Sequence, residues 1–221
     1  MNLNRISIAT LAVVLFSSPA FSGLLVEQFE VSTSVPNLVT ANAIITSNAP
    51  AISGVFGVID FADNPGDASA GDFAGFSPFP NSDGASPFSE RNERFVVRVS
   101  GQVFAPDDGL YTFRTFNDDG LSLDIGGTSV IFDDQLHAVD LRTGSLSLAA
   151  GWHDLSLVFF EQGGGAVLEL AGFGPNGSNQ LLGAPGGLQT RPSAIGAVPE
   201  PGSLAVFGLG MLLAVAQARC M

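Results

Sequence analysis

The sequence predicts an all-β protein, folded as an antiparallel β-sandwich or barrel. Three observations favour this class. Short apolar segments alternate with polar residues at a period of two, which is the side-chain period of a half-buried strand. Clusters of Gly, Asn, Asp and Pro separate these segments, and glycine alone supplies 27 of the 221 residues. Between the two ends of the chain, no stretch shows a convincing helical period of 3.6 residues.

The alternating segments can be followed in order along the chain. In one of the clearest, Leu121, Leu123 and Ile125 alternate with Ser, Asp and Gly. About ten such strands, joined by turns, are enough for two packed sheets or a closed barrel. The expected strands are 24–29, 43–46, 55–61, 95–99, 110–115, 121–125, 129–132, 146–148, 155–159 and 166–170.

One connection between the expected strands is unusually long. The stretch from Phe61 to Glu90 is rich in Gly, Ser, Pro and Asp and carries Phe73, Phe76, Phe79 and Phe88. A loop of this length in a compact domain normally covers something. We expect its phenylalanines to hold it over one sheet face; contact with a ligand is the alternative.

The N-terminal segment reads as a secretory signal peptide over residues 1–22. Arg5 supplies a positive charge, the apolar run 6–16 is too short to span a bilayer, and small residues precede a cut after Ser22. We therefore expect secretion across the inner membrane.

A second targeting signal is expected at residues 199–221. Pro199, Glu200 and Pro201 precede an apolar helix at 204–218 and then Arg219. The apolar run is shorter than the roughly 20 residues of an untilted membrane span. In this order the segment resembles the PEP-CTERM sorting signal of Gram-negative bacteria. The resemblance implies processing by an exosortase, membrane contact through the helix before processing, and a bacterium that makes extracellular polysaccharide. A linker at 175–198 would join this signal to the folded domain.

The net charge limits the classes of partner that the protein can bind, and the cysteine content limits how the domain can be stabilised. The formal net charge is −13 at pH 7, so the surface repels phosphate backbones and attracts divalent cations. Nucleic acid is therefore not an expected partner. The single cysteine, Cys220, lies in the C-terminal tail and cannot form an internal disulfide. The domain must be stabilised by its core or by a bound metal.

Three segments carry a family resemblance. They are "GLLVEQFE" at the expected mature N-terminus, "GLYTFRTFNDDGLSLDIGG" at 109–127, and the strand–glycine loop–strand at 148–171. In this order they resemble the protective-antigen-type (PA-fourteen) β-barrel domain of bacterial toxins, glycosidases and flocculin-like adhesins. The resemblance covers residues 23–174, and 109–127 is its most specific part.

The resemblance implies a calcium site. In the lectin members of the family, the Asp-Asp pair is joined by a cis peptide, both carboxylates bind calcium, and sugar hydroxyls complete the shell. Carried over by position, the ligands are Asp118 and Asp119. Calcium takes six to eight oxygen ligands, and two adjacent carboxylates offer a half-site. The other half comes from the loop after the long strand, 161–165, which has no Asn here. Glu161 is a further metal ligand in this interpretation, and Gln162, Gly163 and Gly164 would contact the sugar.

Other interpretations of the same residues remain open. Asp-Asp-Gly between two alternating strands is a good hairpin turn without any ligand. The protein would then be a structural component of the extracellular matrix rather than a carbohydrate-binding module of the envelope or biofilm. We expect the pairs Asp107-Asp108 and Asp133-Asp134, and Asp124, to bind no cation. An enzyme is not expected, because His137 and His153 lack the partners of a catalytic or zinc site.

Overall fold

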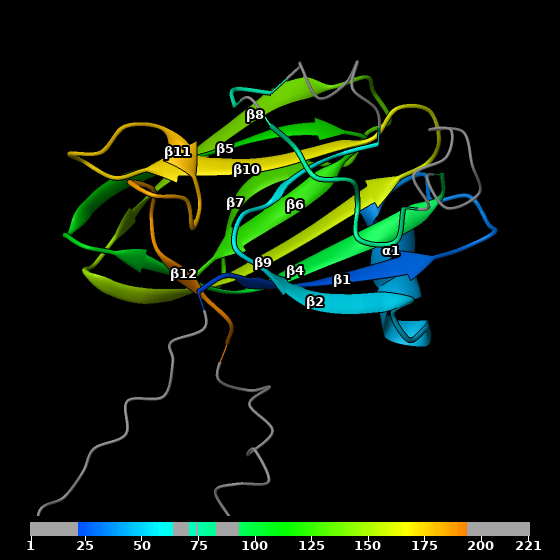
Figure 1. The fold of residues 1–221 in the computed structure, drawn as a ribbon, viewed down its shortest axis with the longest axis horizontal. Coiled ribbons are helices and arrows are strands. Elements are labelled where there is room, and N and C mark those ends of the chain that lie inside the picture. The colour runs from blue at the N-terminus through cyan, green and yellow to red at the C-terminus, as the bar shows by residue number, and fades with distance from the viewer. Residues whose placement is uncertain (1–21, 64–70, 74, 83–92, 194–221) are drawn as a thin grey trace, which may run out of the picture.

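The chain folds as an antiparallel β-sandwich with one helix, which confirms the predicted class (Figure 1). The computed structural model describes residues 22–63, 71–73, 75–82 and 93–193. The expected signal peptide, apolar helix and sorting signal lie outside these residues. Within them, no helix is long and apolar enough to cross a membrane.

The first sheet contains the long central strands. In spatial order it runs β2 (Ile52–Phe56), β1 (Leu24–Glu30), β4 (Phe95–Ala105), β9 (Gly151–Glu161), β6 (Leu121–Ile125) and β7 (Thr128–Asp133), and β12 (Thr190–Arg191) adds to β4.

The second sheet packs across the first. Its order is β11 (Gln180–Leu181), β10 (Val167–Phe173), β5 (Gly109–Asp118) and β8 (Asp140–Leu148), with β3 (Asp60–Ala62) also paired to β10. All strand pairs in both sheets are antiparallel.

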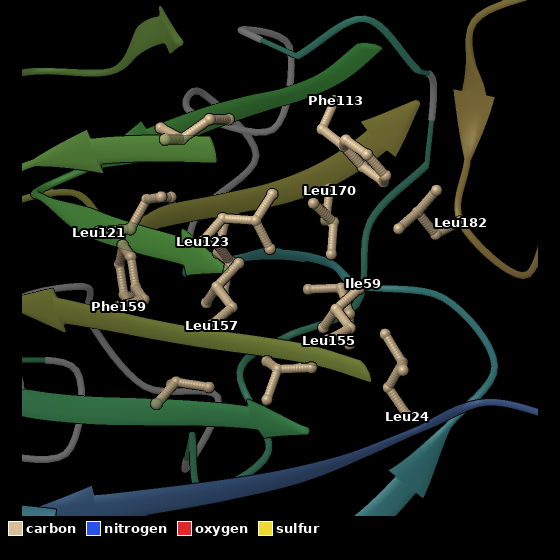
Figure 2. Close-up of a cluster of buried hydrophobic side chains, with 14 of the residues drawn as sticks. Leu24, Ile59, Phe113, Leu121, Leu123, Leu155, Leu157, Phe159, Leu170 and Leu182 are labelled. Atoms are coloured by element: carbon tan, nitrogen blue, oxygen red, sulfur yellow. The ribbon is translucent and has the colours of Figure 1, made fainter. Parts of the chain in front are cut away.

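The hydrophobic core lies between the two sheets. Its side chains come from the alternating positions that the sequence predicted, so that every second residue of a strand points inward. Figure 2 shows Leu123 and Leu157 of the first sheet meeting Leu170 of the second; all three are fully buried. This packing fixes the register of β5, β6 and β9, whose ends carry the expected site.

The predicted strand at 43–46 is wrong, because these residues belong to helix α1 (Leu38–Ser47). The Asn37 side chain caps the helix by accepting a hydrogen bond from the Thr40 N–H at 2.9 Å. Leu38, Ala41 and Ile44 are the buried face. They pack on the outer face of the first sheet, where a second small core lies over β4 and β9. The helix is short and largely apolar, so its period was hard to separate from a strand.

Two further connections differ from the expectation. The predicted strand 55–61 is two strands: β2 ends at Phe56 in the first sheet, and β3 begins at Asp60 in the second. In the long loop, Phe79 is 2% exposed and stacks on Phe159 with ring centroids 5.7 Å apart. That side chain lies in the core between the sheets rather than over one face.

The folded part of the chain extends past residue 175, where the expected linker began. Leu182 is fully buried in the main core, and β12 pairs with β4. The Gly23 N–H donates to the Thr190 carbonyl at 3.3 Å, so the two ends of the described chain leave side by side (Figure 1).

Candidate cation and ligand site

Three carboxylates meet at one end of the sandwich. Asp118 ends β5, Asp119 follows it through a cis peptide bond, and Glu161 ends β9. One carboxylate oxygen from each lies within 4.8 Å of the other two. We call Asp118, Asp119 and Glu161 the carboxylate cluster. The cis peptide that the family resemblance implied is therefore confirmed.

The chain crosses between the sheets at this point, and the crossing places the cluster. Asp118 pairs with Val167 in the second sheet, whereas Leu121 pairs with Phe159 in the first. The crossing is so tight that position 120 has no room for a side chain, and glycine fits there. A Cβ there would lie 2.4 Å from the Asp133 carbonyl oxygen. Asp-Asp-Gly is therefore a passage between two sheets, not a hairpin turn within one.

Backbone N–H groups hold the two buried carboxylates in place. Oδ1 of Asp119 accepts from the His137 N–H and Oδ2 from the Gln162 N–H, both at 2.9 Å. The Asp119 N–H donates to Oε2 of Glu161 at 3.1 Å, and the Gly163 N–H donates to Oε1 at 2.6 Å. These contacts come from three different loops, so the cluster is fixed before any ligand binds.

The electrostatics of the cluster are unfavourable without a cation. Burial, together with repulsion from Asp119 and Asp118, raises the pKa of Glu161 to about 10. Burial also raises the pKa of Asp119, against the opposing effect of its hydrogen bonds from Gln162 and His137. Within the described residues, neither of these two carboxyls forms an ion pair with an arginine. A bound cation would lower the pKa of both carboxyls, because an opposite charge nearby favours the ionised form.

A second set of residues supports the cluster and was not predicted. Asp133 is 5% exposed and binds His137 Nε2 and Arg142 Nε, each at 2.7 Å. Asn117 donates from Nδ2 to the Asp119 carbonyl at 2.7 Å and to Asp133 at 3.1 Å. Asp133 thus already has a positive partner in Arg142. The alternation along β5 was a usable signal, since Asn117 follows Tyr111, Phe113 and Thr115 on the buried face.

The loop after β9 meets only part of the expectation. The side chain of Gln162, expected to face the ligand, points to the segment before α1, where Oε1 accepts from Ser34 Oγ at 2.8 Å and from the Val35 N–H at 2.6 Å. Only its backbone N–H reaches the cluster. Gly163 and Gly164 follow with positive φ values of 154° and 117°, next to Glu161.

One carboxylate of each other acidic pair has a structural partner in another segment of the chain. Asp108, in the turn after β4, accepts through Oδ1 from the Ala150 N–H at 2.6 Å, in the turn between β8 and β9. Asp134 Oδ1 accepts from the Leu38 N–H at 2.5 Å, at the start of α1. Both bonds serve the fold, and neither side chain belongs to the carboxylate cluster.

Comparison with known proteins places these features in a family. The sequence model of the PA14 domain family matches residues 25–175 of this chain. The sequence model of the PEP-CTERM protein-sorting motif matches residues 197–219. No curated protein matches the chain.

Solved structures share the fold at low sequence identity. The PA14 domain of the MpAFP antifreeze protein has a TM-score of 0.58 at 17% identity, covering 82% of this chain and 97% of that one. The PA14 sugar-binding domain from an RTX adhesin has a TM-score of 0.56 at 20% identity, covering 73% and 95%. The epithelial adhesin 9 A domain of Candida glabrata, in complex with Galβ1-3GlcNAc, has a TM-score of 0.55 at 14% identity, covering 81% and 94%.

Proposed function

The chain belongs to the PA14 domain family, and from this premise we propose that it is a carbohydrate-binding protein assisted by calcium. Its place would be outside the inner membrane, secreted or on the cell surface of a Gram-negative bacterium, because a PEP-CTERM sorting motif follows the domain. The proposal is one of binding rather than catalysis. Two of the neighbours in fold are described as sugar-binding or as bound to a sugar.

The observation that carries the proposal is the carboxylate cluster. Three carboxylate oxygens lie within 4.8 Å of one another, and two of them belong to buried carboxyls. Such oxygens are the hard ligands that calcium prefers. Calcium tolerates irregular geometry and high coordination numbers, so backbone carbonyls of the glycine loop 163–165 are suitable further ligands. A bound divalent ion would compensate the repulsion that raises the pKa of Glu161.

The cluster fits a role in recognising hydroxyl groups. Calcium bound there would offer open coordination positions that vicinal sugar hydroxyls can fill. Asp119 and Glu161 are held by backbone N–H groups and need not reorganise on binding. The tie between Gln162 and the segment before α1 fixes the loop beside them.

The position of the cluster also suits display at a surface. Glu161 pairs with Phe95 at the start of β4, whereas β12 pairs with Val103 and Gln102 near its other end. The eight residue-to-residue steps of strand from Phe95 to Val103 span about 27 Å. The chain therefore leaves the domain toward the sorting motif at the end far from the cluster. A protein processed by an exosortase and held through its C-terminal segment would point the cluster outward, toward extracellular polysaccharide or a biofilm matrix.

A glycan array tests the proposal. The purified protein is applied in millimolar calcium and again in EDTA, beside Asp119→Asn and the control Asp107→Asn. We expect at least one glycan to bind in a calcium-dependent manner. EDTA and Asp119→Asn should abolish this calcium-dependent binding, and Asp107→Asn should preserve it. Absence of calcium-dependent binding across neutral and acidic glycans would contradict the proposal, and the protein would then be a structural matrix component.

A further inference from the structure

A pair of aromatic side chains lies on the outer face of the first sheet, away from the carboxylate cluster. Trp152 on β9 is the only tryptophan of the chain, and Phe104 lies directly opposite on β4. Their ring centroids are 5.1 Å apart, and both side chains are partly exposed. Helix α1 covers the other end of this face, over Val96 and Phe160.

A row of polar side chains borders the two rings. The Arg191 guanidinium lies 4.1 Å from the centroid of the Trp152 ring, and its Nε donates to Gln102 Oε1 at 2.7 Å. Gln102 Nε2 in turn donates to Asp154 Oδ1 at 2.8 Å. We call Phe104, Trp152, Arg191, Gln102 and Asp154 the aromatic patch. Three strands supply it, and each polar member is oriented by the next.

Arg191 differs from the other arginines that the structure describes. Arg94, Arg98, Arg114 and Arg142 each form an ion pair with a carboxylate. Arg191 forms none within the described residues, and only its Nε is used in a hydrogen bond there. The indole N–H of Trp152 likewise has no partner in that part of the chain. Stacking on the ring holds the guanidinium, so its remaining donors are oriented but unused.

The chemistry of the patch selects its ligand. A pyranose ring has an apolar face of C–H groups that packs on aromatic rings, and hydroxyls that both donate and accept hydrogen bonds. Arg191 and the Trp152 indole offer donors, and Asp154 offers an acceptor. An anionic ligand is disfavoured by the net charge of −13 and by Asp107 and Asp108 in the turn after β4. The surroundings therefore favour an uncharged sugar.

We propose that the aromatic patch is a second glycan-binding site, which takes neutral pyranose residues of a polysaccharide without a metal ion. It is independent of the carboxylate cluster: Trp152 lies near the start of β9 and Glu161 ends it, so the two are nine residues or about 30 Å apart. One polysaccharide chain bound at both places would gain affinity by avidity. The alternative role for these residues is to clamp β12 where the chain leaves the domain.

The lone tryptophan makes the test direct, because tryptophan emission, excited where Tyr111 does not absorb, reports on this site alone. The purified protein is titrated in EDTA with neutral linear hexasaccharides of gluco, manno and galacto configuration, and with hexagalacturonate, and calorimetry is run in parallel. We expect saturable binding of a neutral hexasaccharide with a change in tryptophan emission, and none of hexagalacturonate. Calcium is absent, so the result does not depend on the carboxylate cluster.

Matched variants separate recognition from clamping. Arg191→Gln should raise the dissociation constant about tenfold or more, as expected when a central donor is lost. Arg114→Gln makes the same charge change on the second sheet and should leave affinity unaltered. Phe104→Ser keeps the tryptophan reporter and should also weaken binding. Binding of no neutral hexasaccharide by either method, or equal affinity in Arg191→Gln with only a lower melting temperature, would overturn the proposal.

Discussion

Replacing Glu161 by glutamine should have opposite effects on stability with and without calcium. In the folded protein the pKa of Glu161 is about 10, so at pH 7 the buried carboxyl keeps a proton that the unfolded chain, with its ordinary pKa of 4.5, has lost. Taking up that proton costs about 3 kcal/mol at pH 7. Glutamine is neutral and avoids this cost.

The substitution also removes a hydrogen-bond acceptor. Glu161 accepts from the N–H groups of both Asp119 and Gly163, but an amide has one oxygen. The unsatisfied N–H costs about 1–2 kcal/mol. In EDTA the variant should therefore be about 1–2 kcal/mol more stable than the wild type, which raises the melting temperature by several degrees in a domain of this size.

In calcium the order should reverse. A site saturated at a hundredfold excess over its dissociation constant adds about 2.7 kcal/mol, and only the wild type has the full cluster. Differential scanning calorimetry at pH 7, in EDTA and in calcium, measures both comparisons. Glu169→Gln is the control, because Glu169 is also buried but binds the N–H groups of Asp72 and Phe73 away from the cluster. A Glu161→Gln protein that is less stable than the wild type in EDTA, or that calcium stabilises as much as it stabilises the wild type, would refute the reasoning.

Three further predictions concern the fold. Burial raises the pKa of Asp60 from 3.8 to about 6, so the folded protein binds this proton more tightly than the unfolded chain, and stability is lost as the pH rises through 6. We expect a higher melting temperature in EDTA at pH 5 than at pH 7, and a smaller difference in Asp60→Asn; an unchanged difference would exclude Asp60 as a source. Gly144→Ala should cost at least about 2 kcal/mol, since its Cβ would lie 2.0 Å from the Val130 carbonyl oxygen, whereas Gly57→Ala has open space; equal urea midpoints would contradict this. Phe79→Ala should cost about 3–5 kcal/mol in urea unfolding, and a cost under 1 kcal/mol would show that the ring does not fill the core.

Much of the fold could be predicted because most strands keep a period of two. Leu121, Leu123 and Ile125 are all fully buried, as their alternation indicated. The prediction failed at α1, where Asn37 begins a short helix that tertiary packing on β4 and β9 stabilises. The pattern also could not show that the chain passes from the first sheet to the second at residues 57–59. The residues on both sides are mostly apolar, so 55–61 looked like one continuous strand.

The site was predicted in part. The sequence and its family resemblance placed Asp118, Asp119 and Glu161, which the fold brings together. They could not place Asp133 and His137, whose roles depend on a hydrogen-bond network across three loops. The side chain of Gln162 was assigned to the ligand because of its position in the loop. Its actual partners, Ser34 and Val35, are more than a hundred residues earlier in the chain.

Calorimetric titration of calcium into the purified protein at pH 7 tests the central claim most directly. We predict saturable binding to a single class of site, lost in Asp118→Asn and in Asp119→Asn and retained in Asp107→Asn. No binding at millimolar calcium, or undiminished binding in both cluster variants, would contradict the assignment of a calcium site to Asp118, Asp119 and Glu161.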